Sequence, residues 1–128
     1  MRQWDNPMQI VFEKVGDVAV AAVPVEELDA SNAGEFKRDV ASSLEANAKV
    51  VLDLSRLRFV DSSGLGAFIS CLRKLNAKGG DLKLCGMSKP VRAVFELVRM
   101  DRVFDILGTK EDAVRAFEPS STSRTGRS

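Results

Sequence analysis

Residues 50–66, which read VVLDLSRLRFVDSSGLG, decide the fold of this protein. Val50 to Leu54 is short, nearly all apolar and β-branched at its start, as expected of a strand that is covered on both faces. From Gly64 to Ala77 the apolar side chains recur at helical spacing, at Leu65, Phe68, Ile69, Leu72 and Leu75. The glycines at 79–80 end that helix. The stretch therefore predicts a buried strand followed by an amphipathic helix.

The chain before this stretch predicts an antiparallel hairpin and a first helix. Two β-rich runs, residues 8–15 and 17–23, flank a turn at Gly16. Between Asn32 and Asn47 the period becomes helical, at Ala33, Phe36, Val40 and Leu44. Asn32 with Glu35 is predicted to form a capping pair at the start of this helix.

The chain after this stretch continues the alternation of strands and helices. Leu82–Cys85 predicts a strand, and Ser88 begins a helix with a proline in its first turn. Val103–Ile106 predicts a last strand, and Thr109 with Asp112 caps a last helix. We therefore predict an α/β fold, with a mixed, largely parallel sheet of about five strands and about four helices packed against it.

The length of 128 residues fits one domain. We assign residues 8–118 to that domain and residues 1–7 to an N-terminal extension. Residues 119–128 (PSSTSRTGRS) contain no aliphatic or aromatic residue that could form a core, which predicts a disordered tail.

The composition excludes several classes of function. Nineteen basic and 18 acidic residues give a formal charge of +1, so nucleic acid is not an expected partner. No apolar run is long enough to cross a membrane, and no signal peptide is recognisable, so we expect a cytoplasmic protein without a membrane partner. The chain has no histidine and two cysteines. We therefore expect no metal site, no cofactor and no catalytic residue, with Cys71 and Cys85 as buried free thiols.

The segment from Phe59 to Gly66 lies where the predicted central strand leads into the second helix. Ser62 and Ser63 can cap that helix, and the free amides of its first turn would stabilise a negative charge. Asp61 is predicted to accept backbone amides. These features alone leave two interpretations open: a site that accommodates a phosphate, and a simple capped turn.

Four motifs resemble the anti-sigma factor antagonists of the STAS domain family. They are residues 51–54 (VLDL), 59–66 (FVDSSGLG), 79–80 (GG) and 82–84 (LKL), and the resemblance spans residues 8–117. It implies that a cognate, ATP-binding serine kinase, which is also the anti-sigma factor, phosphorylates Ser62, and that a cognate serine phosphatase reverses the modification. The resemblance therefore implies partner switching, with the unmodified protein bound to the kinase.

The resemblance also implies the residues that meet the partner. The family has a Gly-Glu-Leu-Asp-like turn whose aspartate lies near the phosphorylated serine; here residues 26–29 read EELD, so Asp29 takes that role and Glu26 replaces the glycine. Ser63 is expected as a cap rather than a second phosphosite, and Leu65 is also a core candidate. The predicted partner-binding residues are Asp29, Asp61, Ser63, Gly64, Leu65 and Gly66.

Other functions remain as alternatives. A serine hydrolase is disfavoured, because no Gly-x-Ser-x-Gly elbow surrounds Ser62 and no histidine can activate it. A phospho-accepting receiver would use Asp53, but it needs an acidic pair after the first strand that the chain lacks. The same fold also occurs in noncatalytic subunits of lipid-transport ABC complexes and in stress-signalling scaffolds.

Overall fold

The structure is a computed structural model that describes residues 8–119. Its main sheet has five strands in the order β1-β2-β4-β6-β7, of which only the β1–β2 pair is antiparallel. These strands are β1 (Glu13–Val15), β2 (Val18–Ala22), β4 (Lys49–Asp53), β6 (Asp81–Cys85) and β7 (Asp105–Leu107). The helices are α1 (Ala33–Ala46), α2 (Ser62–Asn76), α3 (Lys89–Leu97), the 3₁₀ helix η2 (Met100–Arg102) and α4 (Lys110–Arg115). The predicted mixed α/β fold is thus confirmed.

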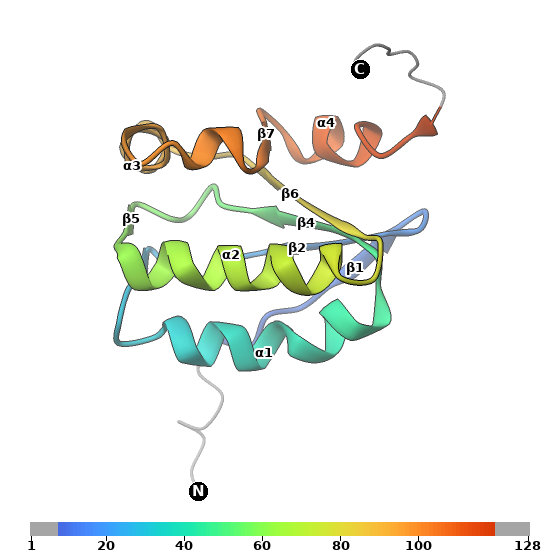
Figure 1. Cartoon of the computed structure of the whole chain (residues 1–128), viewed down its shortest axis with the longest axis horizontal. Helices are drawn as coiled ribbons and strands as arrows, with labels where there is room; N and C mark the ends of the chain where they lie inside the picture. Colours follow the sequence, from blue (N-terminus) through green and yellow to red (C-terminus); the bar gives the residue numbers. More distant parts are fainter. Residues whose placement is uncertain (1–7, 120–128) are drawn as a thin grey trace, which may run out of the picture.

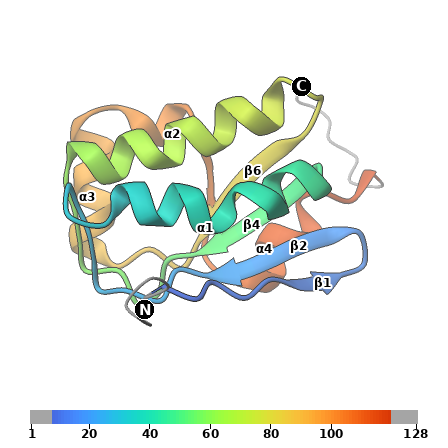
Figure 2. The ribbon, with the colours of Figure 1, turned by 90° about the horizontal axis from the view of Figure 1, so that it is seen from below.

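The main sheet separates two apolar layers. On one face lie α1 and α2, and on the other lies the short helix α4 (Figures 1 and 2). Alternate residues of β2 divide between these layers: Ala19 and Ala21 pack into the large core, whereas Val18 and Val20 join the smaller cluster with Ala113 of α4. Burial on both faces explains why β4 reads as a nearly continuous apolar run.

A chain of phenylalanine rings connects the helices of the large core. The Phe36 and Phe68 ring centroids lie 5.5 Å apart, those of Phe68 and Phe95 6.1 Å, and those of Phe95 and Phe104 6.0 Å. These rings come from α1, α2, α3 and the segment after η2. The large core therefore fixes α3 and η2 relative to the N-terminal half of α2.

A second, two-stranded sheet was not predicted from the sequence. It pairs β3 (Glu27–Leu28) with β5 (Phe59–Val60) in parallel. Each strand has only two residues, too short for a periodic pattern to be recognised. The pairing brings the loop after β3 beside the first turn of α2, although the two segments lie about 30 residues apart in the chain.

Two strands differ from their predicted bounds by more than one residue. The first strand covers only Glu13–Val15 of the predicted run 8–15, although its two-residue turn at Gly16, with a φ of +63°, is as expected. The last strand is Asp105–Leu107 and not Val103–Ile106, because η2 takes up the preceding residues and the buried Phe104 donates its N–H to Met100. The predicted extension, residues 1–7, lies outside the described residues, as does the predicted tail apart from Pro119.

Candidate functional site

Asp61 joins the two segments of the candidate site through both of its carboxylate oxygens. One oxygen accepts a hydrogen bond from the N–H of Gly64 (3.0 Å) and caps α2. The other accepts from the N–H of Ala30 (3.2 Å), in the loop after β3. The prediction that Asp61 accepts backbone amides is confirmed. The expectation that Ser62 and Ser63 cap the helix is wrong, because Asp61 already occupies the cap and α2 begins at Ser62.

Ser62 and Ser63 form the exposed first turn of α2. Within residues 8–119 neither hydroxyl makes a hydrogen bond. The first turn carries no acidic residue, and the amides at the start of a helix favour a negative charge. The structure therefore leaves two free serine hydroxyls at the positive end of a 15-residue helix.

The glycines at 64 and 66, although only two residues apart, have opposite surroundings. Gly64 is buried, and a Cβ added there would lie 2.5 Å from the backbone oxygen of Leu28. Gly66 is exposed, and a Cβ there would meet nothing within 4 Å. Leu65 is 7% exposed and belongs to the large core. Of these three predicted partner-binding residues, only Gly66 is exposed to solvent. Gly64 and Leu65 are buried beneath the surface of the site.

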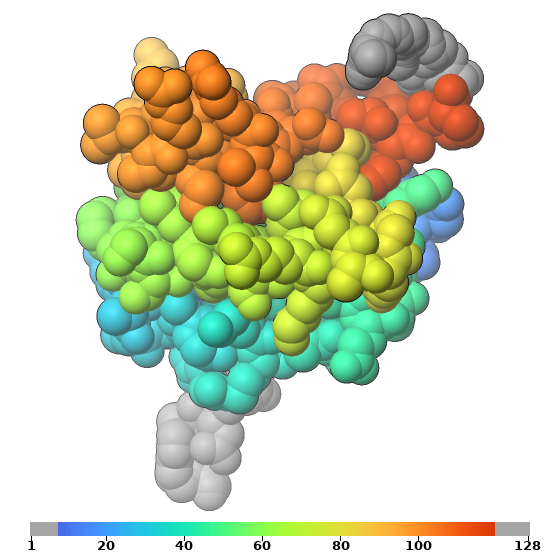
Figure 3. Space-filling view, in the orientation of Figure 1, coloured from blue at the N-terminus to red at the C-terminus, as the bar shows by residue number. Residues whose placement is uncertain are grey.

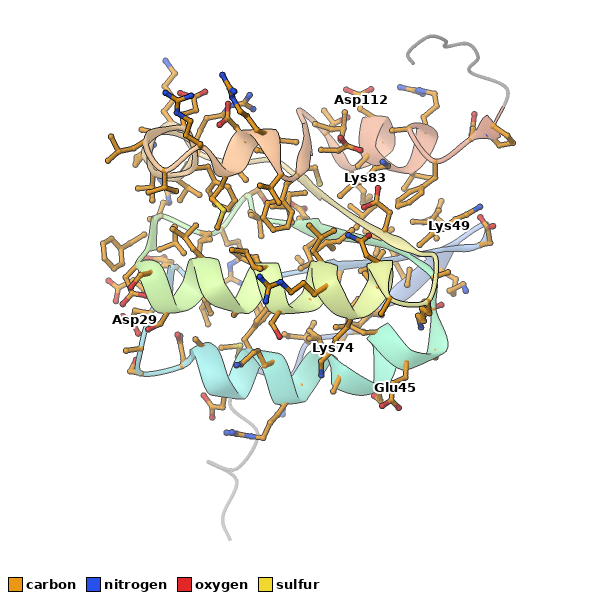
Figure 4. The ribbon with its side chains drawn as sticks, in the orientation of Figure 1. Asp29, Glu45, Lys49, Lys74, Lys83 and Asp112 are labelled. Carbon is orange, nitrogen blue, oxygen red and sulfur yellow. The ribbon has the colours of Figure 1, made fainter. Side chains whose placement is uncertain are left out.

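Asp29 organises the neighbouring loop. Its carboxylate accepts hydrogen bonds from the hydroxyl (2.6 Å) and the N–H (3.0 Å) of Ser31. These bonds hold the pKa of Asp29 below its ordinary value of 3.8. Figure 4 places Asp29 at the same end of the molecule as the start of α2. Asp29 thus lies at the edge of the molecule where α2 begins.

Asn32 has a role that the sequence did not indicate. Its side chain accepts from the N–H of Asp29 (2.9 Å) and donates to the carbonyl of Glu27 (2.9 Å), closing the loop on itself. It makes no cap hydrogen bond to α1, so the predicted capping pair with Glu35 is wrong. Asparagine side chains often form such local hydrogen bonds with neighbouring backbone groups, and these bonds compete with helix capping.

Glu26 fits at the position where a glycine was expected. Its carbonyl accepts hydrogen bonds from the N–H groups of Arg58 (2.7 Å) and Phe59 (3.1 Å). Within residues 8–119 only Gln9 and Arg99 combine a side chain with a positive φ. The turn therefore does not need the conformational freedom of glycine at Glu26.

Phe59 belongs to the exposed surface of the site. It lies on β5 and its side chain is 51% exposed. Phe59 lies within the motif at residues 59–66 but is not among the predicted partner-binding residues. Alternation within a two-residue strand was the only signal that could have identified it, since its neighbour Val60 is buried.

Asp53, the acceptor of the receiver alternative, uses its carboxylate to accept from the N–H of Ser55 (3.0 Å), a strand-end turn contact. Cys71 and Cys85 are buried free thiols, as predicted, and lie in the clusters on opposite faces of the sheet.

Across residues 8–119 there is no group of three acidic or cysteine side chains that could hold a metal. No helix in this part of the chain is long and apolar enough to span a membrane.

Comparison with known proteins agrees with this geometry. The anti-sigma-B factor antagonist of Bacillus subtilis is 26% identical over 89 residues, covering 70% of this chain and 82% of that protein. The crystal structure of TM1081 from Thermotoga maritima has a TM-score of 0.77 at 29% identity, covering 84% of this chain and 92% of that one. The Bacillus protein SpoIIAA in its phosphorylated form shares the fold, with a TM-score of 0.65 at 24% identity and coverage of 85% and 99%. Residues 9–113 match the STAS domain family. The chain belongs to the STAS domain family.

Proposed function

We propose that this protein is an anti-sigma factor antagonist that is switched by phosphorylation of Ser62. In its unmodified form it binds an ATP-binding serine kinase that is also the anti-sigma factor, and phosphorylation releases that kinase. A cognate phosphatase restores the unmodified form. The protein itself acts in the cytoplasm without catalysing a reaction. The observation that carries the proposal is the free, exposed Ser62 hydroxyl at the first turn of α2, whose cap comes from Asp61.

The relatives support this proposal in two ways. The Bacillus subtilis protein is named for antagonism of an anti-sigma factor, and SpoIIAA is known in both unphosphorylated and phosphorylated forms. Phosphorylation of a protein with the same fold shows that this architecture tolerates the modification. We carry the modification to Ser62 because Ser62 follows the capping aspartate directly.

The fold can accept a phosphate on Ser62 without rearrangement. The hydroxyl faces solvent and makes no hydrogen bond that phosphorylation would break within the described residues. The added charge of about −1.5 to −2 would lie at the positive end of α2. Because Asp61 remains the cap, we expect the helix to start at the same residue in both forms.

We therefore expect phosphorylation to weaken the complex with the kinase rather than to destabilise the folded protein. We assign the contact surface to Ser62, Ser63, Gly66, Asp29 and Asp61, with Phe59 added from the structure, while Gly64 and Leu65 set its shape. Burying an unpaired phosphate in such a contact costs several kcal/mol, and about 4 kcal/mol would weaken binding about a thousandfold. Asp29 and Asp61 add repulsion on the same edge.

The experiment uses the full chain and the kinase that it captures from its own cells. We expect ATP and this kinase to add one phosphate to the wild type, at Ser62, and none to Ser62→Ala. Calorimetric titration should give similar affinities for the wild type and Ser62→Ala. Ser62→Asp and the phosphorylated protein should bind at least a hundredfold more weakly.

Ser63→Asp is the matched control, because it introduces the same charge one residue later on the same exposed turn. It should weaken binding less than Ser62→Asp, and all variants should melt within a few degrees of the wild type. Phosphate found only on Ser63 would contradict the assignment. Equal affinity of the phosphorylated and unmodified proteins would contradict the switch itself.

A further inference from the structure

A compact apolar and basic surface lies where α3 ends and η2 begins. We define the α3–η2 corner as Leu97, Val98, Arg99, Arg102 and Val103. Leu97 is 82% exposed, Val98 48% and Val103 53%, so the corner holds three of the six large apolar side chains that are exposed within residues 8–119. Solvent-exposed apolar side chains gathered in this way are typical of interaction sites.

The charges of the corner are positive and unpaired. Arg99 and Arg102 are exposed and form no ion pair within the described residues. By contrast, Arg92, on the preceding helix, is paired with Glu96 at 3.1 Å. The only acidic residue of the corner's backbone segment is Asp101, which is partly buried. An arriving carboxylate would therefore find two guanidinium groups without a competing partner.

The backbone of the corner is held in a defined conformation. Arg99 has φ 64° and ψ 23°, the left-handed region, which is uncommon for a long side chain. The turn is closed by hydrogen bonds from the N–H of Arg99 to Glu96 (3.1 Å) and from Val103 to Met100 (3.0 Å). Strained conformations of this kind persist where the surrounding structure enforces them, and they cluster at functional sites.

The corner also has a rigid base. Phe95 and Phe104, on either side of it in the chain, are buried and pack edge-on with ring centroids 6.0 Å apart. Figure 3 shows the surface of this orange segment above the green surface of α2. The exposed side chains therefore project from a packed core, so little ordering would be needed when a partner binds.

We propose that the α3–η2 corner docks an acidic, amphipathic segment of a partner protein, with carboxylates on the two arginines and a large apolar side chain against Leu97, Val98 and Val103. The α3–η2 corner shares no residue with the Ser62 contact surface, and this proposal does not depend on the proposed function. Charge complementarity selects the occupant, because the whole chain carries only +1 whereas the corner carries two unpaired arginines.

An anionic membrane is the other surface that attracts arginine and leucine together. Each arginine near such a surface contributes only about 1 kcal/mol, and stable membrane binding needs a second anchoring signal. A protein segment fits better, since paired carboxylates and apolar contacts can both be met by one amphipathic helix.

The test titrates the isotopically labelled full chain with a 14-residue amphipathic peptide of glutamate and leucine, observed by NMR. The control peptide replaces every glutamate with lysine. We expect the acidic peptide to shift the amides of residues 96–104, with an affinity that falls as salt rises, and the basic peptide to leave them unmoved. No shift of these amides at millimolar acidic peptide, or equal binding of both peptides, would overturn the proposal.

Variants test which side chains are responsible. Arg99→Glu combined with Arg102→Glu should weaken the acidic peptide at least tenfold, and Leu97→Ser severalfold. Arg73→Glu combined with Lys74→Glu changes the same charge on exposed positions of α2 and should leave the affinity unchanged. Equal losses of affinity for the acidic peptide in both double variants would show a general charge effect and would refute specific binding at the α3–η2 corner.

Two further measurements separate the remaining outcomes. Arg99→Gly suits the left-handed backbone, so it should melt no lower than the wild type while binding the acidic peptide severalfold more weakly. Co-sedimentation with vesicles of phosphatidylcholine and phosphatidylserine should give no binding at 150 mM salt. If the wild type binds vesicles and the Arg99→Glu, Arg102→Glu variant does not, the ligand of the corner is a membrane and not a protein segment.

Discussion

Gly64 and Leu28 approach so closely that a Cβ on Gly64 would lie 2.5 Å from the backbone oxygen of Leu28. The same oxygen accepts the N–H of Asp61 at 3.2 Å, so β3 is pressed against the first turn of α2. The segment 29–32 reaches the serine pair only because no side chain stands at Gly64. The shape of the candidate site therefore depends on the lack of a Cβ at Gly64 as much as on the polar groups around it.

The first prediction compares the two glycines of the motif. Gly64→Ala should lower the free energy of unfolding by about 2 kcal/mol, because backbone and the Val60 side chain must move to admit the methyl group. Gly66→Ala should leave it unchanged or raise it by up to about 1 kcal/mol, since alanine is the better helix former and the site is open. Urea unfolding measures both. A Gly64→Ala variant as stable as Gly66→Ala would show that β3 does not press on α2.

The second prediction concerns the cap of α2. Asp61→Ala should lower the free energy of unfolding by about 1–2 kcal/mol, because it removes the acceptor for Gly64 and for Ala30 together. Ser62→Ala and Ser63→Ala should change it by less than about 0.5 kcal/mol, as expected of exposed side chains. Thermal and urea unfolding provide the comparison. Larger losses in the serine variants than in Asp61→Ala would reverse the assignment of the cap.

The third prediction is a pH dependence that originates in Asp29. Because Ser31 lowers the pKa of Asp29 below 3.8, the ionised form is favoured in the folded protein. Its contribution to stability is present above about pH 4, and it is lost as the pH falls through the lowered pKa. Ser31→Ala should raise the pKa of Asp29 toward 3.8, measured by NMR of the carboxyl carbon. An unchanged pKa in Ser31→Ala would show that other groups cause the shift.

The fourth prediction concerns the two thiols. Burial raises the pKa of Cys71 to about 11 and that of Cys85 to about 12, so at pH 8 at most about one thiol in a thousand is ionised. Both should react with a thiol reagent only after unfolding, with rates that rise sharply in urea. Because the two side chains lie on opposite faces of the sheet, oxidation should give no intramolecular disulfide. Rapid labelling of either thiol in the folded protein would contradict this placement.

The strand and helix order was largely predictable from the sequence, because burial imposes a period on the apolar residues. The pattern at Leu65, Phe68 and Leu72 located α2, and the run at 50–54 located β4. The predicted caps at Ser88 and Thr109 are confirmed, with bonds to the N–H groups of Val91 and Asp112. These are local signals, decided within a few residues of chain.

The sequence by itself thus determined the α/β class and singled out Asp61 as an acceptor of backbone amides. It also placed Ser62 and Ser63 at the start of a helix. Only the tertiary structure decided that Asp61, rather than a serine, caps α2. The Asp61 carboxylate is held in place by a second hydrogen bond, from the N–H of Ala30, which lies 31 residues away in the chain. The β3–β5 pairing and the burial of Gly64 against Leu28 likewise depend on contacts between segments that lie about 30 residues apart in the chain. A two-residue strand has no periodicity to be read, and its hydrogen bonds exist only once the surrounding core has brought both segments together.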